Sequence, residues 1–451
     1  MKLKKDLIDY IKKNFKNASL NYIDVDGFAS SISVDKFEIY EDKIIFDKPP
    51  YIRKFLEHEN ATLIFNHITE IPTGGYTDRR YISIIGKIKE ENNKIVFIPK
   101  KFYRWDEKIV PFVQYCEINV PNAIRYLRGL EERIGRKIRP LLHENKVLDK
   151  IYFLFRIYRL PFLFASLFPC LISILLANKI GYFDLFLATL LMIGVALIHM
   201  GLNLANDYFD YKADEINRTP TPFSGGSRSL QYGLISPNGA KLAFLICYLI
   251  AIPIGIYLAM IRGLLEVLTI MTAGVAISLL YTAPPAKLSY RGFGEIAVAI
   301  GFGPIIMLGS YFVMTQKIDL NIILASIPIG IIVCSILYIN EIPDRKWDVK
   351  AGKRTLVTRI SKEKVPLGYA ILIILTYATQ ILAVMFKALP ISSLLTLLFA
   401  YMPISIYKNA KKYIELPYEM VPSLDKHIRF YVIYSAIISA SIIYETYLPI
   451  I

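Results

Sequence analysis

Apolar and polar positions are arranged differently in the two parts of this chain. Before residue 120, short apolar stretches alternate with turn-forming residues, whereas after residue 150 the apolar residues gather in nine long runs. These runs lie near 151–178, 184–206, 239–260, 264–282, 293–314, 319–341, 365–386, 388–407 and 429–449. A helix of about 20 apolar residues crosses the hydrocarbon core of a bilayer and satisfies its own backbone hydrogen bonds there. The pattern therefore predicts an all-α polytopic membrane domain of nine transmembrane helices over residues 151–451.

The first 120 residues have the pattern of a small soluble domain. Leu3, Leu7, Ile8, Ile11 and Phe15 form an apolar stripe at helical spacing, which predicts an opening helix. Strand-like stretches rich in β-branched and aromatic residues follow, separated by turn sequences such as Asp-Gly and Thr-Gly-Gly. They are SLNYIDV, FASSISV, FEIYEDKIIF, ATLIFNHI, RRYISIIGKIK and NKIVFIPKKFY. We predict a mostly antiparallel sheet or barrel over residues 1–120, followed by a basic helical connector over residues 121–150 near the anionic membrane face.

Charge distribution supports a membrane location for the second domain. The chain has 451 residues, of which 54% are hydrophobic, and a formal net charge of +15. In a soluble protein this charge would suggest nucleic acid as a partner, but here the cations lie largely in loops between apolar runs. Most loop cations follow the second, fourth, sixth and eighth runs. We therefore predict an integral cell membrane protein with no nucleic-acid partner, in which those loops and the N-terminal domain are cytoplasmic and the C-terminus is on the other side.

A cluster of polar side chains lies at the end of the second apolar run. Asn203, Asp207, Asp210 and Asp214 are spaced at i, i+4, i+7 and i+11, which places them on one face of a helix. Carboxylates on one face repel each other and are costly at membrane depth. A shared divalent cation would relieve both problems, and Mg²⁺ prefers oxygen ligands together with substrate phosphates.

A second acidic cluster follows the sixth run. Asn340, Asp344 and Asp348 lie near one helix face, and Gly352, Lys353 and Arg354 come directly after them. Two acidic faces with basic loops are suited to hold a metal–diphosphate between them.

Two further loops offer groups for an anion. Residues 281–295 contain Tyr281 and Lys287, and a lysine can hold a diphosphate as a point charge, although both residue types are also common anchors at a membrane edge. Residues 221–237 contain Gly225 and Gly226, which let backbone N–H groups approach an anion, followed by Arg228.

The two acidic clusters together resemble the paired aspartate-rich motifs of the UbiA superfamily of membrane prenyltransferases, over roughly residues 150–450. The resemblance implies nine helices and Mg²⁺-dependent transfer of a polyprenyl group from an isoprenyl diphosphate to a lipophilic acceptor in the membrane lipid. The loops at 221–237 and 281–295 resemble the naphthoate-prenyltransferase branch, which implies an aromatic, quinone-precursor-like acceptor. Residues 214–218 instead resemble the branch that alkylates glycerol-phosphate ethers, so the acceptor stays open.

The resemblance also implies roles for individual residues. The expected metal ligands are Asn203, Asp207, Asp210, Asp214, Asp344 and Asp348. The expected catalytic residues are Asp207, Asp210, Asp344, Asp348 and Lys287. The expected substrate-binding residues are Asn203, Asn206, Arg218, Arg228, Tyr281, Lys353 and Arg354.

Two alternatives concern other classes of function. Intramembrane acids also mark ion pathways, so a cation-coupled transporter is the rival for the membrane domain, although the sequence has no clear repeat. The N-terminal stretch resembles the split barrel of the pyridoxamine-phosphate-oxidase and flavin-reductase group. That resemblance implies FMN, with Arg79, Arg80 and Lys87 as phosphate partners, but these residues also fit a solvated strand face.

Overall fold

The computed structural model describes residues 2–55, 60–70, 76–110, 154–217, 219–231 and 234–448. The chain forms two compact units, Met1–Cys116 and Glu117–Ile451, and each is described by itself. The predicted connector over residues 121–150 and the predicted phosphate ligand Arg218 lie outside the described residues.

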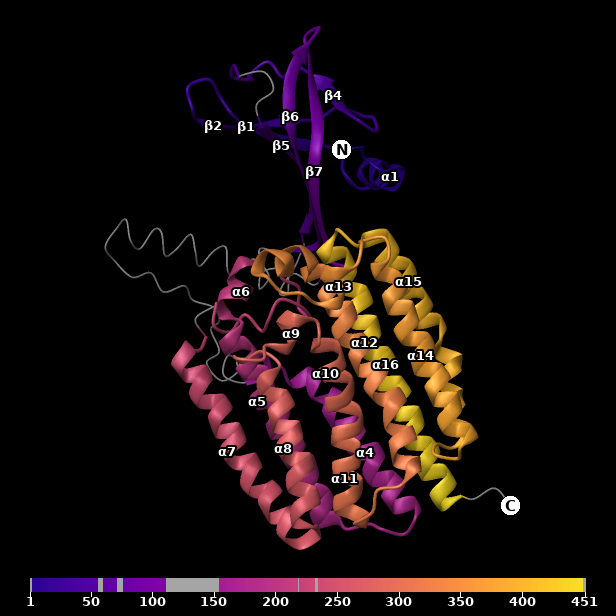
Figure 1. The fold of residues 1–451 in the computed structure, drawn as a ribbon. Helices are drawn as coiled ribbons and strands as arrows, with labels where there is room; N and C mark the ends of the chain where they lie inside the picture. Colours follow the sequence, from indigo (N-terminus) through magenta and orange to yellow (C-terminus); the bar gives the residue numbers. More distant parts are fainter. Residues whose placement is uncertain are drawn as a thin grey trace. The chain divides into compact units, whose positions relative to one another are not determined.

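The N-terminal unit is an antiparallel sheet with one helix, as predicted. Its strands are β1 (Ala18–Ile23), β2 (Ala29–Val34), β3 (Glu38–Ile39), β4 (Ile44–Asp47), β5 (Asn60–Glu70), β6 (Tyr76–Glu91) and β7 (Lys94–Asp106). Their order among the described residues is β2-β1-β5-β6-β7-β4-β3, with the long β6–β7 hairpin in the middle (Figure 1). Helix α1 (Lys5–Asn14) buries Leu7 and Ile11 against a core that includes Phe65 and Phe97. Alternate residues of β1 and β5 are buried, which is the period expected of a sheet with one covered face.

The second unit is a bundle of long helices (Figure 1). Its principal helices are α4 (Phe164–Lys179), α5 (Leu185–Phe209), α7 (Pro237–Arg262), α8 (Leu264–Leu280), α10 (Gly294–Ile300), α11 (Ile306–Thr315), α12 (Leu320–Ala351), α14 (Val365–Met385), α15 (Tyr401–Tyr413) and α16 (Pro417–Tyr447). Short helices connect or extend them: η1 (Leu160–Leu163), α6 (Tyr211–Ile216), α9 (Leu288–Arg291), η2 (Gly301–Ile305), α13 (Leu356–Arg359) and η3 (Ile391–Phe399).

All nine predicted apolar runs are helical, but the prediction of nine spanning helices needs correction. Among the described residues, eight helical segments are long and apolar enough to cross a membrane. In this count α10, η2 and α11 form one continuous segment, and η3 and α15 form another. The fourth predicted run forms α8, which is apolar but has only 17 residues. Helix α12 continues past the predicted end at residue 341 to Ala351, so the second acidic cluster lies inside the helix.

Local signals set the helix ends. Asp184 accepts a hydrogen bond from the Leu187 N–H at the start of α5, and Asp319 accepts one from Ile322 at the start of α12. At the end of α12, Gly352 adopts a left-handed conformation with φ of 78°. These local signals set where the two helices that carry the acidic clusters begin and where α12 ends.

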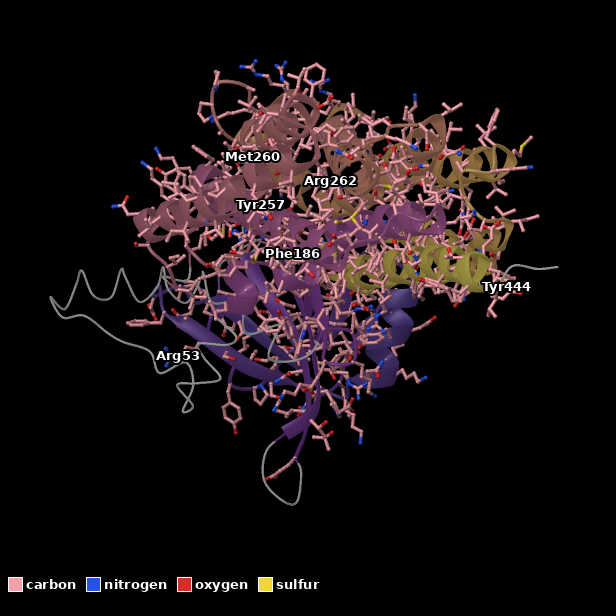
Figure 2. All side chains as sticks on the ribbon, turned by 90° about the horizontal axis from the view of Figure 1, so that it is seen from below. Arg53, Phe186, Tyr257, Met260, Arg262 and Tyr444 are labelled. Atoms are coloured by element: carbon pink, nitrogen blue, oxygen red, sulfur yellow. The ribbon has the colours of Figure 1, made fainter. Side chains whose placement is uncertain are left out.

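Helix α12 lies in the centre of the bundle. Its most apolar window is 72% buried, against 28% for α5 and α14. It approaches η2 closely, since a Cβ on Gly303 would lie 2.7 Å from the Cα of Gly330. Large apolar side chains stay exposed on the outer helices, among them Met260 on α7 at 71%, which Figure 2 shows beside Tyr257. An exposed apolar surface of this kind suits contact with lipid.

The two ends of the bundle differ. At one end, Lys179 of α4 bonds Glu445 of α16 at 2.8 Å, so the C-terminal end of α16 lies beside the C-terminal end of α4. Helix α5 runs back from there, so the acidic cluster at its C-terminal end lies at the opposite end of the bundle (Figure 1).

Candidate active site

The C-terminal ends of α5 and α12 face one cavity with a volume of about 390 Å³. Residues from both predicted acidic clusters and the loops beside them line its polar end. They are Asn203, Asn206, Asp210, Asp214, Asn217, Asn340, Glu341, Asp344, Asp348 and Lys353. Packing therefore brings together two clusters that are far apart in the sequence.

The cavity continues as an apolar arm between α5, α7, α8, η2 and α11. Leu190, Gly194, Ile254, Met271 and Ile305 are part of its wall. The lining residues extend along α5 from Leu190 to Asp210, which caps its C-terminal end; at 1.5 Å per residue this is roughly 30 Å. One end of the cavity is thus rich in carboxylates, and the other suits a long hydrocarbon chain.

Asp207 is not part of the cavity lining, but its partner Arg159 is. Asp207 is 3% exposed, pairs with the guanidinium of Arg159, and accepts hydrogen bonds from the Ser227 N–H at 3.1 Å and the Ser227 hydroxyl. Burial lowers the pKa of Arg159, but Asp207 and Asp214 outweigh it and raise that pKa. The sequence analysis missed Arg159, whose signal was a cation inside the first predicted apolar run, at 151–178.

Asp210 and Asp348 are joined by one lysine. Asp210 accepts hydrogen bonds from Lys353 at 2.8 Å and from the Tyr290 hydroxyl at 2.8 Å. The same lysine lies 4.0 Å from an oxygen of Asp348 on α12. Burial opposes the charge of Lys353, but Asp210, Asp214 and Asp348 raise its pKa well above the ordinary value. Lys353 therefore connects the two clusters electrostatically.

Asp344 is held by uncharged donors. Its Oδ1 accepts from the Asn217 amide at 2.8 Å and from the Ser224 hydroxyl at 3.0 Å. Both donors lie in the segment after α6, so this segment is fastened to α12.

Asp214 is seated against Gly226 of the following loop, which comes directly after Gly225. Gly225 and Gly226 have φ angles of 78° and 79°, and a Cβ on Gly226 would lie 2.1 Å from the Asp214 Oδ2. Burial raises the pKa of Asp214 to about 7, with Lys353 and Arg228 acting in the opposite direction. Only glycine permits both this backbone and this approach.

Three of the cations predicted to bind the diphosphate lie outside the cavity lining. Lys287 lies over the ring of Tyr290, 4.9 Å from its centroid. Arg354 is exposed, and its backbone N–H donates to Tyr290. Arg228 is 2% exposed and donates to the carbonyl oxygens of Asp214 and Asn217, so it fixes the loop that carries the two glycines. These three side chains are not part of the cavity lining, whereas Tyr281 and Lys353 are.

The donor atoms at the polar end fit Mg²⁺. Within the described residues no group of three His, Cys, Asp or Glu side chains is already gathered as a metal site. However, the carboxylates and amides that line the cavity offer only oxygen as metal-binding atoms, which Mg²⁺ prefers. Asn340 Oδ1 and Glu341 Oε2 are buried and have no hydrogen-bond partner within the part of the chain that the structure describes, although both residues line the cavity. Unpaired buried oxygens are costly, and a cation with its water ligands would satisfy them.

Comparison with known proteins identifies the family. Residues 166–414 match the model of the UbiA prenyltransferase family. The chain belongs to the UbiA prenyltransferase family. It is therefore an integral membrane protein, and the predicted resemblance and fold class are confirmed. The matched region does not include the N-terminal unit, so the split-barrel resemblance stays a prediction.

Individual relatives extend this finding. The chain is 34% identical over 192 residues to the 1,4-dihydroxy-2-naphthoate octaprenyltransferase of Bacillus subtilis, covering 43% of this chain and 60% of that one. It is 29% identical over 221 residues to the enzyme of the same name from Haemophilus influenzae, covering 48% and 70%. A UbiA homologue from Aeropyrum pernix K1 has a TM-score of 0.49 at 17% identity, covering 62% and 97%. A homologue from Archaeoglobus fulgidus bound to GPP and Mg²⁺ has a TM-score of 0.43 at 16% identity, covering 64% and 99%. The chain thus spans 60% of the length of the Bacillus protein.

Proposed function

We propose that this protein transfers a polyprenyl group from an isoprenyl diphosphate to a lipophilic aromatic acceptor of the quinone-precursor type, with Mg²⁺ as cofactor. The observation that carries the proposal is a cavity that extends roughly 30 Å along α5, with carboxylates and Lys353 at one end and an apolar arm at the other. The naphthoate prenyltransferases among the relatives favour the aromatic acceptor.

Asn203, Asp210, Asp214, Asp344 and Asp348 would hold the metal, since each lines the polar end of the cavity. When bound, Mg²⁺ supplies positive charge that stabilises the departing diphosphate. We assign Asp207 to orientation, because its oxygens already accept from Arg159 and Ser227.

The chain's own groups supply the remaining stabilisation. Lys353 adds a point charge beside Asp210 and Asp348. Gly225 and Gly226 expose backbone toward the cavity, as required for close approach of a phosphate. In the reaction the bond between C1 of the prenyl group and the diphosphate oxygen breaks, and its electron pair leaves with the diphosphate. A ring carbon of the acceptor forms the new bond to C1 and then loses its proton.

The test is an assay of the purified protein in detergent with radiolabelled prenyl diphosphates and a panel of acceptors. We expect a lipophilic labelled product with hydroxylated naphthoates, and loss of that product when Mg²⁺ is chelated. The panel includes glycerol-phosphate ethers, because residues 214–218 resemble the branch that uses them. Product with the ethers alone would replace the aromatic acceptor in the proposal, and no product with any acceptor would contradict prenyl transfer.

We also propose that the polar end of the cavity is cytoplasmic, on the basis of the loop charges. The C-terminal end of α16 is at the opposite end of the bundle. A reporter fused after Ile451 should therefore report a location outside the cytoplasm, and a cytoplasmic signal would reverse the orientation.

FMN binding by the N-terminal unit stays a prediction. Arg79 pairs with Glu107 at 3.0 Å and Arg80 with Asp78 at 2.6 Å, so both guanidinium groups already have acidic partners. A flavin absorbance spectrum in the purified protein would support it.

A further inference from the structure

We propose that His199 binds a hydroxyl group of the acceptor through its Nε2 atom. This inference rests on the proposed function and deepens it, because it names the group on the acceptor that the site recognises. His199 lies on α5, is 6% exposed, and lines the cavity. It is four residues, or about one helical turn, from Asn203 on the side of the apolar arm.

The hydrogen bonds of Ser166 assign the imidazole tautomer. The Ser166 hydroxyl donates to the Leu163 carbonyl oxygen at 3.0 Å and lies 2.8 Å from His199 Nδ1. A serine hydroxyl has one proton, so both contacts are satisfied only if Nδ1 carries the imidazole proton and donates to Ser166. The neutral ring, which burial favours, then has a lone pair on Nε2.

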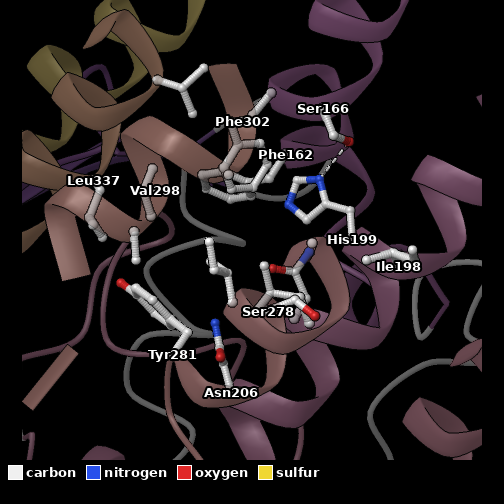
Figure 3. A pocket seen from close by; sticks show the side chains of 18 of the residues that line it. Phe162, Ser166, Ile198, His199, Asn206, Ser278, Tyr281, Val298, Phe302 and Leu337 are labelled. Atoms are coloured by element: carbon white, nitrogen blue, oxygen red, sulfur yellow. Dashed lines mark hydrogen bonds between the residues drawn. The ribbon is translucent and has the colours of Figure 1, made fainter. Parts of the chain in front are cut away.

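This lone pair points into the cavity. Figure 3 shows the second nitrogen of His199 directed toward the open middle of the cavity, away from Ser166. The ring of Phe302 packs edge to face with the imidazole at 5.0 Å, and Phe162 lies beside Phe302 in the same view. A hydrogen-bond acceptor beside aromatic side chains suits a planar ring that carries a hydrogen-bond donor.

The other molecules expected in the cavity do not supply that donor. A diphosphate has only acceptor oxygens when it is ionised, and a prenyl chain has no polar hydrogen. Mg²⁺ prefers oxygen to an imidazole nitrogen. A hydroxyl on the acceptor ring donates a hydrogen bond, so it is the group that Nε2 recognises.

A second polar group lies on the same helix. Asn206 accepts a hydrogen bond from Thr282 at 2.8 Å through its Oδ1, so its amide nitrogen is directed to the cavity beside Tyr281 (Figure 3). His199 and Asn206 are seven residues apart, which places them on one face of α5. The acceptor therefore meets one hydrogen-bond acceptor and one donor along this face.

The experiment compares two aromatic acceptors, one hydroxylated and one with a hydroxyl replaced by hydrogen, in the wild-type protein and in His199→Ala. For each protein, the preference is the ratio of kcat/KM for the hydroxylated acceptor to kcat/KM for the other. The two rings differ in reactivity, but that difference is common to both proteins and cancels when the two preferences are compared. We expect His199→Ala to reduce the preference for the hydroxylated acceptor about tenfold while the KM for the prenyl diphosphate stays within about twofold.

The matched control is His427→Ala. His427 is also fully buried, but Ser335 and Tyr369 hydrogen-bond its two nitrogens at 2.9 and 3.0 Å, and it is not part of the cavity lining. It should keep the wild-type preference. If His199→Ala no longer binds the diphosphate, His199→Gln replaces it and should keep only part of the preference.

The possible failures are distinguishable. If the wild-type protein forms no product with either acceptor, the proposed function fails. If the wild-type protein is active and the His199 variant keeps the full preference for the hydroxylated acceptor, the role of His199 is wrong and the proposed function stands.

Discussion

The two acidic clusters look alike in the sequence but differ in how the folded protein neutralises them. In the first cluster, Asp207 pairs with Arg159 and Asp210 with Lys353, so two of its three carboxylates have a direct cationic partner. In the second, the hydrogen-bond donors to Asp344 among the described residues are the uncharged Asn217 and Ser224, and Asp348 is 4.0 Å from Lys353.

This difference distinguishes carboxylates that orient the site from carboxylates that bind metal. A buried carboxylate that is tied to an arginine orients its surroundings, because releasing it would leave the arginine charge unpaired. A carboxylate with uncharged donors or a distant lysine keeps negative charge for a metal. We therefore expect the second cluster, with Asp214, to bind metal, and Asp207 to hold the site in shape. Asp210 pairs with Lys353 but lines the same cavity, so we keep it among the metal ligands.

The largest expected effect comes from Asp348→Ala. Removing this carboxylate should weaken Mg²⁺ binding and reduce transfer by about 10³-fold, since several kcal/mol of charge stabilisation are lost. The measurement is kcat against Mg²⁺ concentration, together with the melting temperature in detergent. The melting temperature should stay near the wild-type value, and full activity with an unchanged Mg²⁺ dependence would contradict a metal role for Asp348.

Asp207→Ala should reduce both activity and stability. It leaves the partly buried Arg159 guanidinium without its main partner, which costs about 2 kcal/mol. Thermal unfolding in detergent measures this loss, and the double variant Asp207→Ala/Arg159→Met should recover stability without recovering activity. If Asp207→Ala is as stable as the wild type, the pair does not hold the site and the contrast between the clusters is lost.

Gly226→Ala tests the loop that holds Asp214. The new Cβ would lie 2.1 Å from Asp214 Oδ2, so the carboxylate must move and transfer should fall about 10²-fold. The control is Gly352→Ala, where φ is equally positive at 78° but nothing lies within 4 Å of the added atom. Both variants carry a backbone cost of about 1 kcal/mol, so equal activity in the two would show that strain, and not the Asp214 contact, matters.

The smallest expected effect is that of Asp184→Ala at the other end of α5. Asp184 caps the helix by accepting from Leu187 at 3.0 Å, so its loss should cost about 1 kcal/mol of stability. Activity per folded molecule should be close to that of the wild type. A strong loss of activity would mean that the two ends of α5 are coupled. It would contradict the expectation that transfer depends on the carboxylates at the polar end alone.

The sequence by itself determined the features that depend on nearby residues. Runs of about 20 apolar residues specify helices in lipid, and the alternation before residue 110 specifies strands, because both patterns are local. The spacing of Asn203, Asp207, Asp210 and Asp214 placed these residues on neighbouring turns in the same way. The sequence also showed the second cluster, Asp344 and Asp348, and the lysine that follows it.

Only the tertiary structure decided which charges meet. Arg159 and Asp207 are 48 positions apart, and Lys353 and Asp210 are 143 apart. Their pairing depends on how α5, α12 and the loops pack, and no local pattern encodes it. The same packing extended α12 past the apolar run and directed His199 to the cavity. It also placed the Arg228 guanidinium against the carbonyl oxygens of Asp214 and Asn217 instead of in the cavity. Local periodicity thus fixes what each segment becomes, whereas a buried charge or lone pair finds its partner only after distant helices come together.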